Sequence, residues 1–207
     1  MQTATEVGGD YYDFHVSEDG TLTTVVGDAT GHGVKAGVMV TAIKSMFISN
    51  SQHEEIPSMF KHFSKSIREL NLEYMYMCLA ILKIKGYKMR LASAGIPPVL
   101  LHRKKQNSLE YITLKGLPLG TITEYPYEER KIDLFPGDTI IAMSDGYPEL
   151  FNQNDEMLGY DNILGIVENI DKDNPEKIIT MLKKSIDEWK GNSPARDDIT
   201  FVVIKVN

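Results

Sequence analysis

Four short sequences place aspartate beside glycine or beside a second aspartate. They are Val7-Gly8-Gly9-Asp10, Gly27-Asp28-Ala29-Thr30-Gly31-His32-Gly33, Met143-Ser144-Asp145-Gly146 and Arg196-Asp197-Asp198-Ile199-Thr200. A carboxylate at the end of a strand can point into a cleft, and an adjacent glycine lets another backbone segment approach it closely. Carboxylates gathered in one cleft repel one another, so they raise one another's pKa values or require a cation.

The chemistry that such a set favours is the binding of a hard cation. Oxygen-only ligands select Mg²⁺ or Mn²⁺ rather than Zn²⁺, and a site with two ions is suited to displacement at phosphorus. Each motif alone has a simpler interpretation. Asp-Gly is a common turn, Asp28 could cap the helix that follows it, and adjacent acids such as Asp197 and Asp198 are usually solvated. The four motifs together favour the functional interpretation.

The elements that must position these residues are predicted from hydrophobic patterns. Strands are predicted at Thr21–Gly27, Cys78–Lys85, Tyr87–Ala92, Val99–His102, Leu109–Leu114, Arg130–Leu134, Asp138–Met143 and Ile199–Val206. Helices are predicted at Ala36–Ile48, Ser58–Leu70, Pro175–Trp189 and, shorter, Tyr160–Val167. Long runs of strands without helices between them argue against a doubly wound parallel sheet. We therefore expect an α+β fold in which sheets pack on sheets and helices lie outside.

The composition limits the class of protein. The 207 residues carry 22 Lys and Arg against 29 Asp and Glu, so the net charge of −7 makes nucleic acid an unfavourable partner. The one cysteine, Cys78, excludes internal disulfides and is expected to be a buried structural residue. No apolar run is long enough to span a bilayer, so we expect no membrane contact by this segment and a cytoplasmic location. Without a linker or a repeat, residues 1–207 are predicted to form a single domain.

Five motifs in order carry a resemblance to a known family. They are VGGDYYDF (7–14), GDATGHG (27–33), GLPLG (116–120), SDG (144–146) and RDDITFVVIKV (196–206). The chain resembles the PPM-type (type 2C) protein phosphatases, and within them the bacterial SpoIIE-like and RsbU-like branch. The resemblance implies an αββα sandwich of two antiparallel β-sheets flanked by helices. It also implies hydrolysis of phosphoserine or phosphothreonine, by attack of a water that bridges two Mn²⁺ or Mg²⁺ ions.

The resemblance assigns roles to residues of this chain. Asp28 would bridge both metal ions and Asp145 would bind the first, and these two are the expected catalytic residues. The remaining ligands implied are Asp10 and the Ala29 carbonyl at the second ion and Asp197 at the first, with Asp198 as the alternative to Asp197.

His32 is the candidate substrate-binding residue, because it could touch phosphate or act as a general acid. It could equally be a loop residue between two glycines. It lies two positions beyond the general-acid histidine of the eukaryotic enzymes, so that role is not carried over. The family's Asn-Ala-Gly-His-Pro-Pro segment reads Ser93-Ala94-Gly95-Ile96-Pro97-Pro98 here, and a proline, Pro148, follows the SDG motif.

The expected partner is a phosphorylated regulator of the anti-sigma-factor-antagonist (STAS) type, by family analogy. Only nine residues precede Asp10. We therefore expect the C-terminal catalytic part of a longer protein, compatible with an upstream sensor domain, a membrane-anchored parent and a homodimer. The main alternative is a catalytically silent phosphatase-like module that binds a phosphorylated protein. A nucleotide cyclase, suggested by Gly8-Gly9-Asp10-Tyr11-Tyr12, is rejected because only seven residues precede Gly8.

Overall fold

A computed structural model describes residues 1–4, 6–52, 55–169 and 174–207 of the chain. The chain forms two compact units. The five-stranded unit comprises Thr5–Ile96 and Leu114–Leu134, and the four-stranded unit comprises Met1–Ala4, Pro97–Thr113 and Phe135–Asn207. Every strand pair in both sheets is antiparallel. The predicted α+β class with two antiparallel sheets is therefore confirmed.

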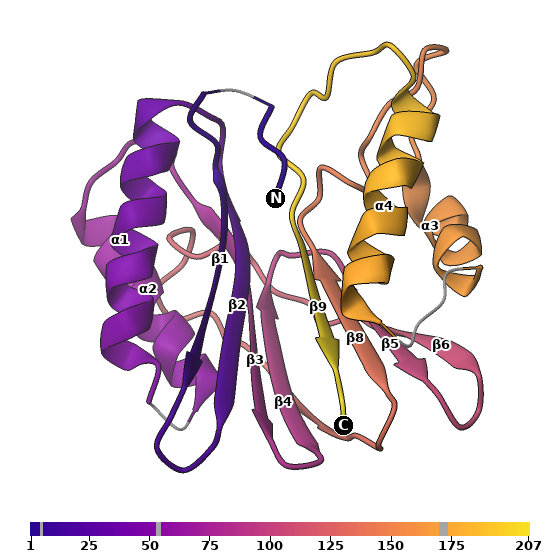
Figure 1. The fold of residues 1–207 in the computed structure, drawn as a ribbon. Helices are drawn as coiled ribbons and strands as arrows, with labels where there is room; N and C mark the ends of the chain where they lie inside the picture. The colour runs from indigo at the N-terminus through magenta and orange to yellow at the C-terminus, as the bar shows by residue number, and fades with distance from the viewer. Residues whose placement is uncertain (5, 53–54, 170–173) are drawn as a thin grey trace. The chain divides into compact units, whose positions relative to one another are not determined.

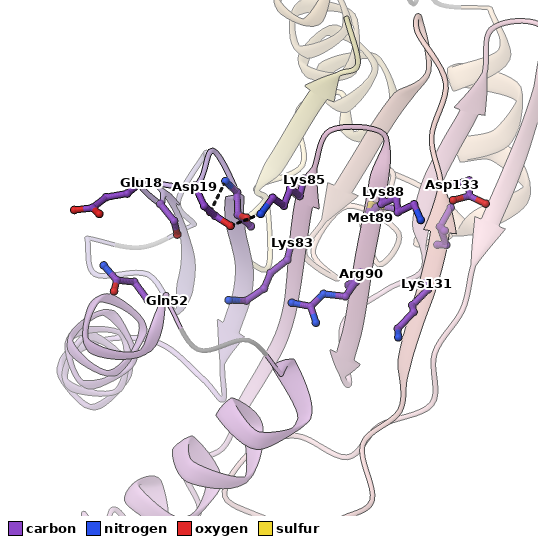
Figure 2. Close-up of a pocket in the computed structure, with 13 residues that line it drawn as sticks. Glu18, Asp19, Gln52, Lys83, Lys85, Lys88, Met89, Arg90, Lys131 and Asp133 are labelled. Atoms are coloured by element: carbon purple, nitrogen blue, oxygen red, sulfur yellow. Dashed lines mark hydrogen bonds and ion pairs between the residues drawn. The ribbon is translucent and has the colours of Figure 1, made fainter.

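The five-stranded unit holds the first two aspartate motifs. Its sheet has the order β1 (Asp10–Val16), β2 (Leu22–Ala29), β3 (Met77–Lys85), β4 (Lys88–Ala94) and β7 (Glu129–Asp133). Helices α1 (Val34–Asn50) and α2 (Ile56–Glu69) cover one face of this sheet (Figure 1). At the opposite end of the sheet from Asp10, side chains of β3, β4 and β7 line a pocket (Figure 2).

The core of this unit explains why these segments fold as they do. Met39 and Phe47 of α1, and Phe60 and Phe63 of α2, are at most 1% exposed and belong to one cluster with Ile81 of β3. Helical spacing brings these side chains to one face of each helix. Pro57 lies in the first turn of α2, where a missing N–H costs no hydrogen bond. Strands β3 and β4 form a hairpin in which Lys85 pairs with Lys88.

The four-stranded unit holds the other two aspartate motifs. Its sheet has the order β6 (Ser108–Ile112), β5 (Val99–Arg103), β8 (Thr139–Met143) and β9 (Phe201–Lys205), and its helices are α3 (Gly159–Glu168) and α4 (Pro175–Lys190). Asn174 caps α4, because its side chain accepts hydrogen bonds from two backbone N–H groups of the first turn. Ile178, Leu182 and Ile186 of α4 are buried in the core that covers this sheet.

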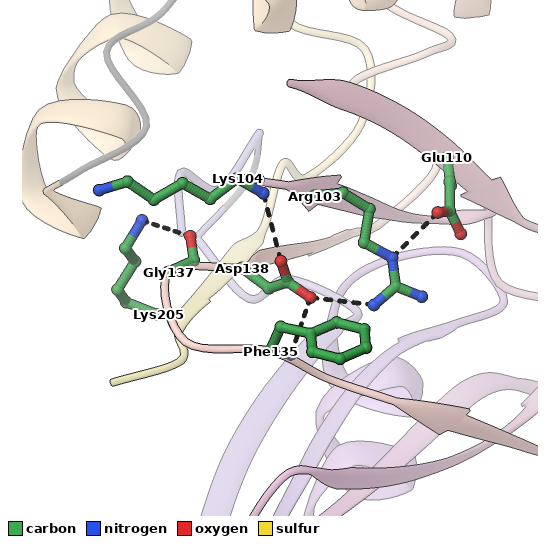
Figure 3. A network of polar contacts seen from close by, with 7 residues as sticks. All are labelled: Arg103, Lys104, Glu110, Phe135, Gly137, Asp138 and Lys205. Carbon is green, nitrogen blue, oxygen red and sulfur yellow. Dashed lines mark hydrogen bonds and ion pairs between the residues drawn. The ribbon is translucent and has the colours of Figure 1, made fainter. Parts of the chain in front are cut away.

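Arg103 is the last residue of β5 and directly precedes the exposed turn that begins with Lys104 and Lys105. The Arg103 side chain is 13% exposed, and its guanidinium donates to Asp138 and to Glu110, both at 2.9 Å (Figure 3). Asp138, 1% exposed, also accepts from the backbone N–H groups of Lys104 and Phe135. The carboxylate therefore joins the loop before β8 to the end of β5.

Replacing Asp138 by alanine is expected to lower the free energy of unfolding by about 3 kcal/mol, because it removes the buried one of the two carboxylates that pair with a largely buried guanidinium. Urea unfolding followed by circular dichroism would measure the change. The matched control is Glu188→Ala, which removes an exposed ion pair with Lys184 and is expected to cost less than about 0.5 kcal/mol. Equal losses in the two variants would contradict the structural role of Asp138.

Among the described residues, none of the helices is both long enough and apolar enough to cross a bilayer.

Candidate metal centre

The first two aspartate motifs meet at one end of the five-stranded sheet. Asp10 begins β1 and lies opposite Asp28, the residue before the last of β2, in the antiparallel register. Residues directly opposite on neighbouring strands have Cβ atoms about 5 Å apart, and like charges at such positions destabilise a sheet. Asp10 is 4% exposed and Asp28 is half-buried. Two carboxylates that lie this close together and are largely shielded from solvent favour the binding of a cation.

Gly9 lies where two backbone segments approach each other closely, at this end of the sheet. A Cβ atom on Gly9 would lie 2.7 Å from the Ala29 carbonyl oxygen, 2.8 Å from the Gly31 carbonyl oxygen and 3.0 Å from Oδ1 of Asp28. The Ala29 N–H donates to the Gly9 carbonyl at 3.0 Å. Glycine is therefore required where the chain entering β1 packs on the turn that leaves β2.

The loop after β2 decides between two interpretations of Asp28. Gly31 and Gly33 have φ values of 75° and 83°, a region that glycine adopts readily, and Gly33 is the N-cap residue of α1 without any side-chain capping bond. Asp28 is therefore not the cap of the helix that follows it. His32 is exposed between the two glycines, so it is accessible to a ligand and has no packing role.

The other two aspartate motifs meet in the four-stranded unit. Asp145 follows β8 by two residues, and the segment of Asp197 and Asp198 leads into β9. A Cβ atom on Gly146 would lie only 2.0 Å from the Asp198 carbonyl oxygen. Ser144 holds the two segments together, because its N–H donates to the Thr200 carbonyl at 3.1 Å and its hydroxyl accepts from the Thr200 N–H at 2.9 Å.

Asp145 has surroundings that suit a ligand of a cation. Its Oδ1 atom is buried and makes no hydrogen bond with any described residue. Burial, followed by the charges of Asp197 and Glu149, raises the pKa of Asp145 to about 6. A positive charge would reverse both effects, because it favours the ionised carboxylate and occupies its lone pairs. The residues here therefore fit a divalent cation bound through oxygen.

The two tandem acids have different environments. Asp198 is 3% exposed, and its Oδ1 atom accepts from the Ala4 N–H at 2.7 Å. Asp197 is exposed, and its charge is the one that acts on Asp145. These contacts favour Asp197 as the ligand beside Asp145. The Asp198 side chain instead connects the N-terminal residues to the segment that precedes β9.

The implied ligand set as a whole stays a prediction. In neither unit do the described residues bring three or more His, Cys, Asp or Glu side chains into a cluster that could hold a metal ion. The structure shows the local geometry of each acidic pair. It also places the Ala29 carbonyl close to the pair of Asp10 and Asp28.

Comparison with known proteins identifies the family. Residues 18–207 match the family described as Stage II sporulation protein E (SpoIIE). The chain belongs to the SpoIIE family. Phosphoserine phosphatase RsbU of Bacillus subtilis is 28% identical over 154 residues, which cover 73% of this chain and 46% of that protein. The chain thus spans less than half the length of this relative.

Solved structures show the same fold. The SiaA-PP2C domain of Pseudomonas aeruginosa matches with a TM-score of 0.85 at 19% identity, over 100% of this chain and 83% of that one. RsbX, solved in complex with magnesium, matches with a TM-score of 0.72 at 18% identity, over 98% of this chain and 90% of that one. The predicted resemblance and fold class are both confirmed.

Some residues of this SpoIIE-family chain could not be found from its motifs. Glu149 acts on Asp145, and its N–H donates to the Asp145 carbonyl at 2.9 Å. The only signal for Glu149 in the sequence is that it follows Asp145 by four residues, and a turn explains that spacing equally well.

Cys78, which the sequence analysis expects to be buried, is partly exposed. The segment that differs from the family's polar motif lies mostly inside, with Ala94 and Ile96 buried.

Proposed function

We propose that this chain is a metal-dependent phosphatase that hydrolyses phosphoserine or phosphothreonine in a protein substrate. The observation that carries the proposal is the buried Asp145 oxygen without a hydrogen-bond partner, beside the negative charge of Asp197. Membership of the SpoIIE family and similarity to a phosphoserine phosphatase support the same reaction. A carboxylate in such surroundings is stable only with a cation or a proton.

We propose that the ligands are Asp10, Asp28, the Ala29 carbonyl, Asp145 and Asp197, and that the ions are two Mn²⁺ or Mg²⁺. Every donor is an oxygen, which suits these hard cations. The magnesium in the solved RsbX structure supports a divalent cation in this fold. Asp197 is kept in this set in preference to its alternative, Asp198, because the Asp198 carboxylate accepts the Ala4 N–H.

The bound ions would lower the pKa of a water and offset the charge of the phosphoryl oxygens. The chain's own contribution is to hold its carboxylates in place. Gly9 keeps Asp28 close to the entering strand, and Gly146 keeps Asp145 close to the segment of Asp197. His32, exposed on a loop between two glycines, is the side chain proposed to contact the phosphoprotein.

We propose a phosphorylated STAS-type regulator as the substrate, by analogy within the family. The net charge of −7 opposes the approach of a phosphoprotein, and bound divalent cations would reduce that repulsion locally. We therefore expect substrate binding, like turnover, to depend steeply on metal concentration.

Removal of divalent metal is expected to reduce phosphate release to less than about 1% of the Mn²⁺-loaded rate, because several kcal/mol of transition-state stabilisation are lost. Release from para-nitrophenyl phosphate and from a phosphoserine peptide would be followed during titration with EDTA and then with Mn²⁺. Full recovery with Mn²⁺ is expected. Undiminished release in EDTA would contradict the proposal. No release at saturating Mn²⁺ from folded protein would instead favour the silent binding module.

A further inference from the structure

Strand β1 forms an open edge of the five-stranded sheet and exposes apolar side chains there. It comes first in the strand order, so among the described residues β2 is its one neighbour in the sheet (Figure 1). Tyr12, Phe14 and Val16 are each more than half exposed. They alternate with Tyr11 and Asp13, which contact side chains of α1, so the three exposed side chains lie on one face of the strand. An exposed apolar edge strand is a template for pairing with another chain.

The two edges of this sheet differ in the features that prevent such pairing. Natural edge strands are protected by charged side chains, above all lysine, by proline or by a bulge. At the opposite edge, β7 carries four charged side chains among its five residues, and these include Arg130 and Lys131. Strand β1 has no lysine, arginine or proline, and its register with β2 is unbroken from Asp10 to Val16. The β1 edge therefore lacks the protection that β7 has.

The backbone of Phe14 faces the open side of β1. Its N–H donates to Oδ1 of Asp13 at 2.9 Å, and this contact is exposed. In an antiparallel ladder the N–H and the C=O of one residue point to the same neighbouring strand. Phe14 therefore presents both groups to a strand that would pair with this edge, and a carbonyl of that strand could take the place of the Asp13 carboxylate.

We propose that β1 is a dimerisation surface, which pairs antiparallel with β1 of a second copy of this chain about a two-fold axis at Phe14. Every strand pair in this sheet is already antiparallel, so the dimer would continue the same pattern. A two-fold axis makes the interface isologous, with the same seven residues of each copy on its two sides. In this register the two Phe14 residues exchange both of their backbone hydrogen bonds.

The side chains of β1 complement one another in this register. Phe14 meets Phe14, and Tyr12 meets Val16 of the second copy. Aromatic pairs and pairs of an aromatic with a β-branched residue are both favourable across strands. On the other face Asp13 lies opposite His15 of the second copy, so an acid faces a base. The Nε2 atom of His15 is buried and makes no hydrogen bond with any described residue.

A shift of the axis would lose this complementarity. An axis at Asp13 places two like charges directly opposite each other, which destabilises a sheet. An axis at His15 places the two histidines opposite each other and leaves Asp13 opposite Ser17. The side chains therefore favour the axis at Phe14, and the match of β1 to itself favours a second copy over an unrelated partner.

Sedimentation velocity of the whole chain, at concentrations from about 5 to about 500 µM, would test the proposal. Seven residues a side are fewer than the roughly 20–30 of a standard interface, so we expect a weak dimer with a dissociation constant of roughly 10–100 µM. EDTA is present throughout, so that divalent metal cannot link two chains through their aspartates. A chain that stays monomeric at the highest concentration would overturn the proposal.

The variant Phe14→Lys is expected to weaken the dimer about tenfold or more, because it places two positive charges opposite each other at the axis. The matched control is Ile122→Lys, which adds the same charge at a half-exposed apolar residue of the same unit. It is expected to leave the dissociation constant within about twofold of that of the unchanged chain. Circular dichroism spectra and thermal unfolding would establish that both variants are folded. Equal weakening in the two variants would contradict a specific interface at β1.

Cysteine cross-linking would test the register independently. In a background with Cys78→Ala, the variant Phe14→Cys is expected to form a disulfide between two copies under mild oxidation, because the pairing brings its Cα atoms to about 5.5 Å. Tyr12→Cys alone is not expected to cross-link, since the two equivalent positions would lie about 13 Å apart along the strands. Mixed with Val16→Cys chains, it is expected to form the disulfide. Cross-linking of Tyr12→Cys to itself, with none from Phe14→Cys, would overturn the proposed pairing.

Discussion

Replacing Asp145 by asparagine is expected to lower kcat for phosphate release by about 10³-fold or more. The substitution keeps the shape of the side chain and removes its negative charge, so the expected loss is that of a metal ligand. Several kcal/mol of transition-state stabilisation depend on a bound divalent ion, and each 1.36 kcal/mol corresponds to a factor of ten in rate. Release from a phosphoserine peptide at several Mn²⁺ concentrations would measure the loss.

The same substitution is expected to stabilise the metal-free protein at neutral pH. Burial and the charges of Asp197 and Glu149 raise the pKa of Asp145 to about 6 in the folded chain, against about 3.9 in an unfolded chain. Asp145 then ionises more easily in the unfolded chain than in the folded one. Above pH 6 its negative charge therefore lowers the free energy of unfolding. Asparagine removes this cost, which is about 3 kcal/mol.

The pH dependence gives this expectation its sign. The gain from Asp145→Asn is present above pH 6, decreases as the pH falls, and disappears below about pH 4, where Asp145 is protonated in both states. Urea unfolding in EDTA at pH 8 and at pH 4 would measure it. The control is Asp187→Asn, an exposed acid of α4, which is expected to change neither kcat nor the pH dependence. Unchanged phosphate release in Asp145→Asn would refute the assignment of Asp145 as a ligand.

Elements with a strong periodic pattern could be predicted from the sequence. The helices and the strands β2, β3, β4 and β8 each bury a continuous or periodic set of apolar side chains, and their predicted bounds differ from the observed ones by a few residues. Here the local pattern and the tertiary packing favour the same structure. Helix ends were less predictable, as α1 extends two residues beyond its predicted end at Ile48.

Strand β1 was not predicted, although it carries Asp10. Its inward positions hold Tyr11, Asp13 and His15, whereas its outward positions hold the exposed Tyr12 and Phe14. A typical strand alternates apolar residues on its buried face with polar residues on its exposed face. Here apolar side chains lie on the exposed face and polar ones on the inward face, so this pattern is missing from the sequence. The strand exists because it pairs with β2 along its whole length, and such long-range pairing is not visible in a local pattern.

The candidate site was predictable in its residue types and less so in its geometry. Motifs identified the acids, but they could not decide between Asp197 and Asp198. That choice depends on the hydrogen bond from the Ala4 N–H to Asp198, between residues 194 positions apart. Likewise, the Gly-Asp and Asp-Gly spacings suggested close backbone approach, but only the fold indicates what approaches Gly9 and Gly146. Backbone contacts between distant segments carry this information.

Replacing Gly146 by alanine is expected to lower kcat by about 10²-fold while every proposed ligand stays in the chain. The new Cβ atom would lie 2.0 Å from the Asp198 carbonyl oxygen and 3.0 Å from its carbon. Backbone atoms cannot turn aside as a flexible side chain can, so the segment that carries Asp197 must move away from Asp145. A displacement of about 1 Å at a site that positions reacting groups costs on the order of 10²-fold in rate.

The matched control is Gly165→Ala in α3, where a Cβ atom would meet no atom within 4 Å. It is expected to leave kcat unchanged and to stabilise the helix by about 1 kcal/mol. Gly146→Ala is expected to need more Mn²⁺ for half-maximal activity, because two proposed ligands are separated without being removed. A fall in kcat together with an unchanged Mn²⁺ requirement would mean that Gly146 acts through folding alone. The Mn²⁺ titration therefore distinguishes positioning of Asp145 and Asp197 from general stability, which a loss of rate cannot do.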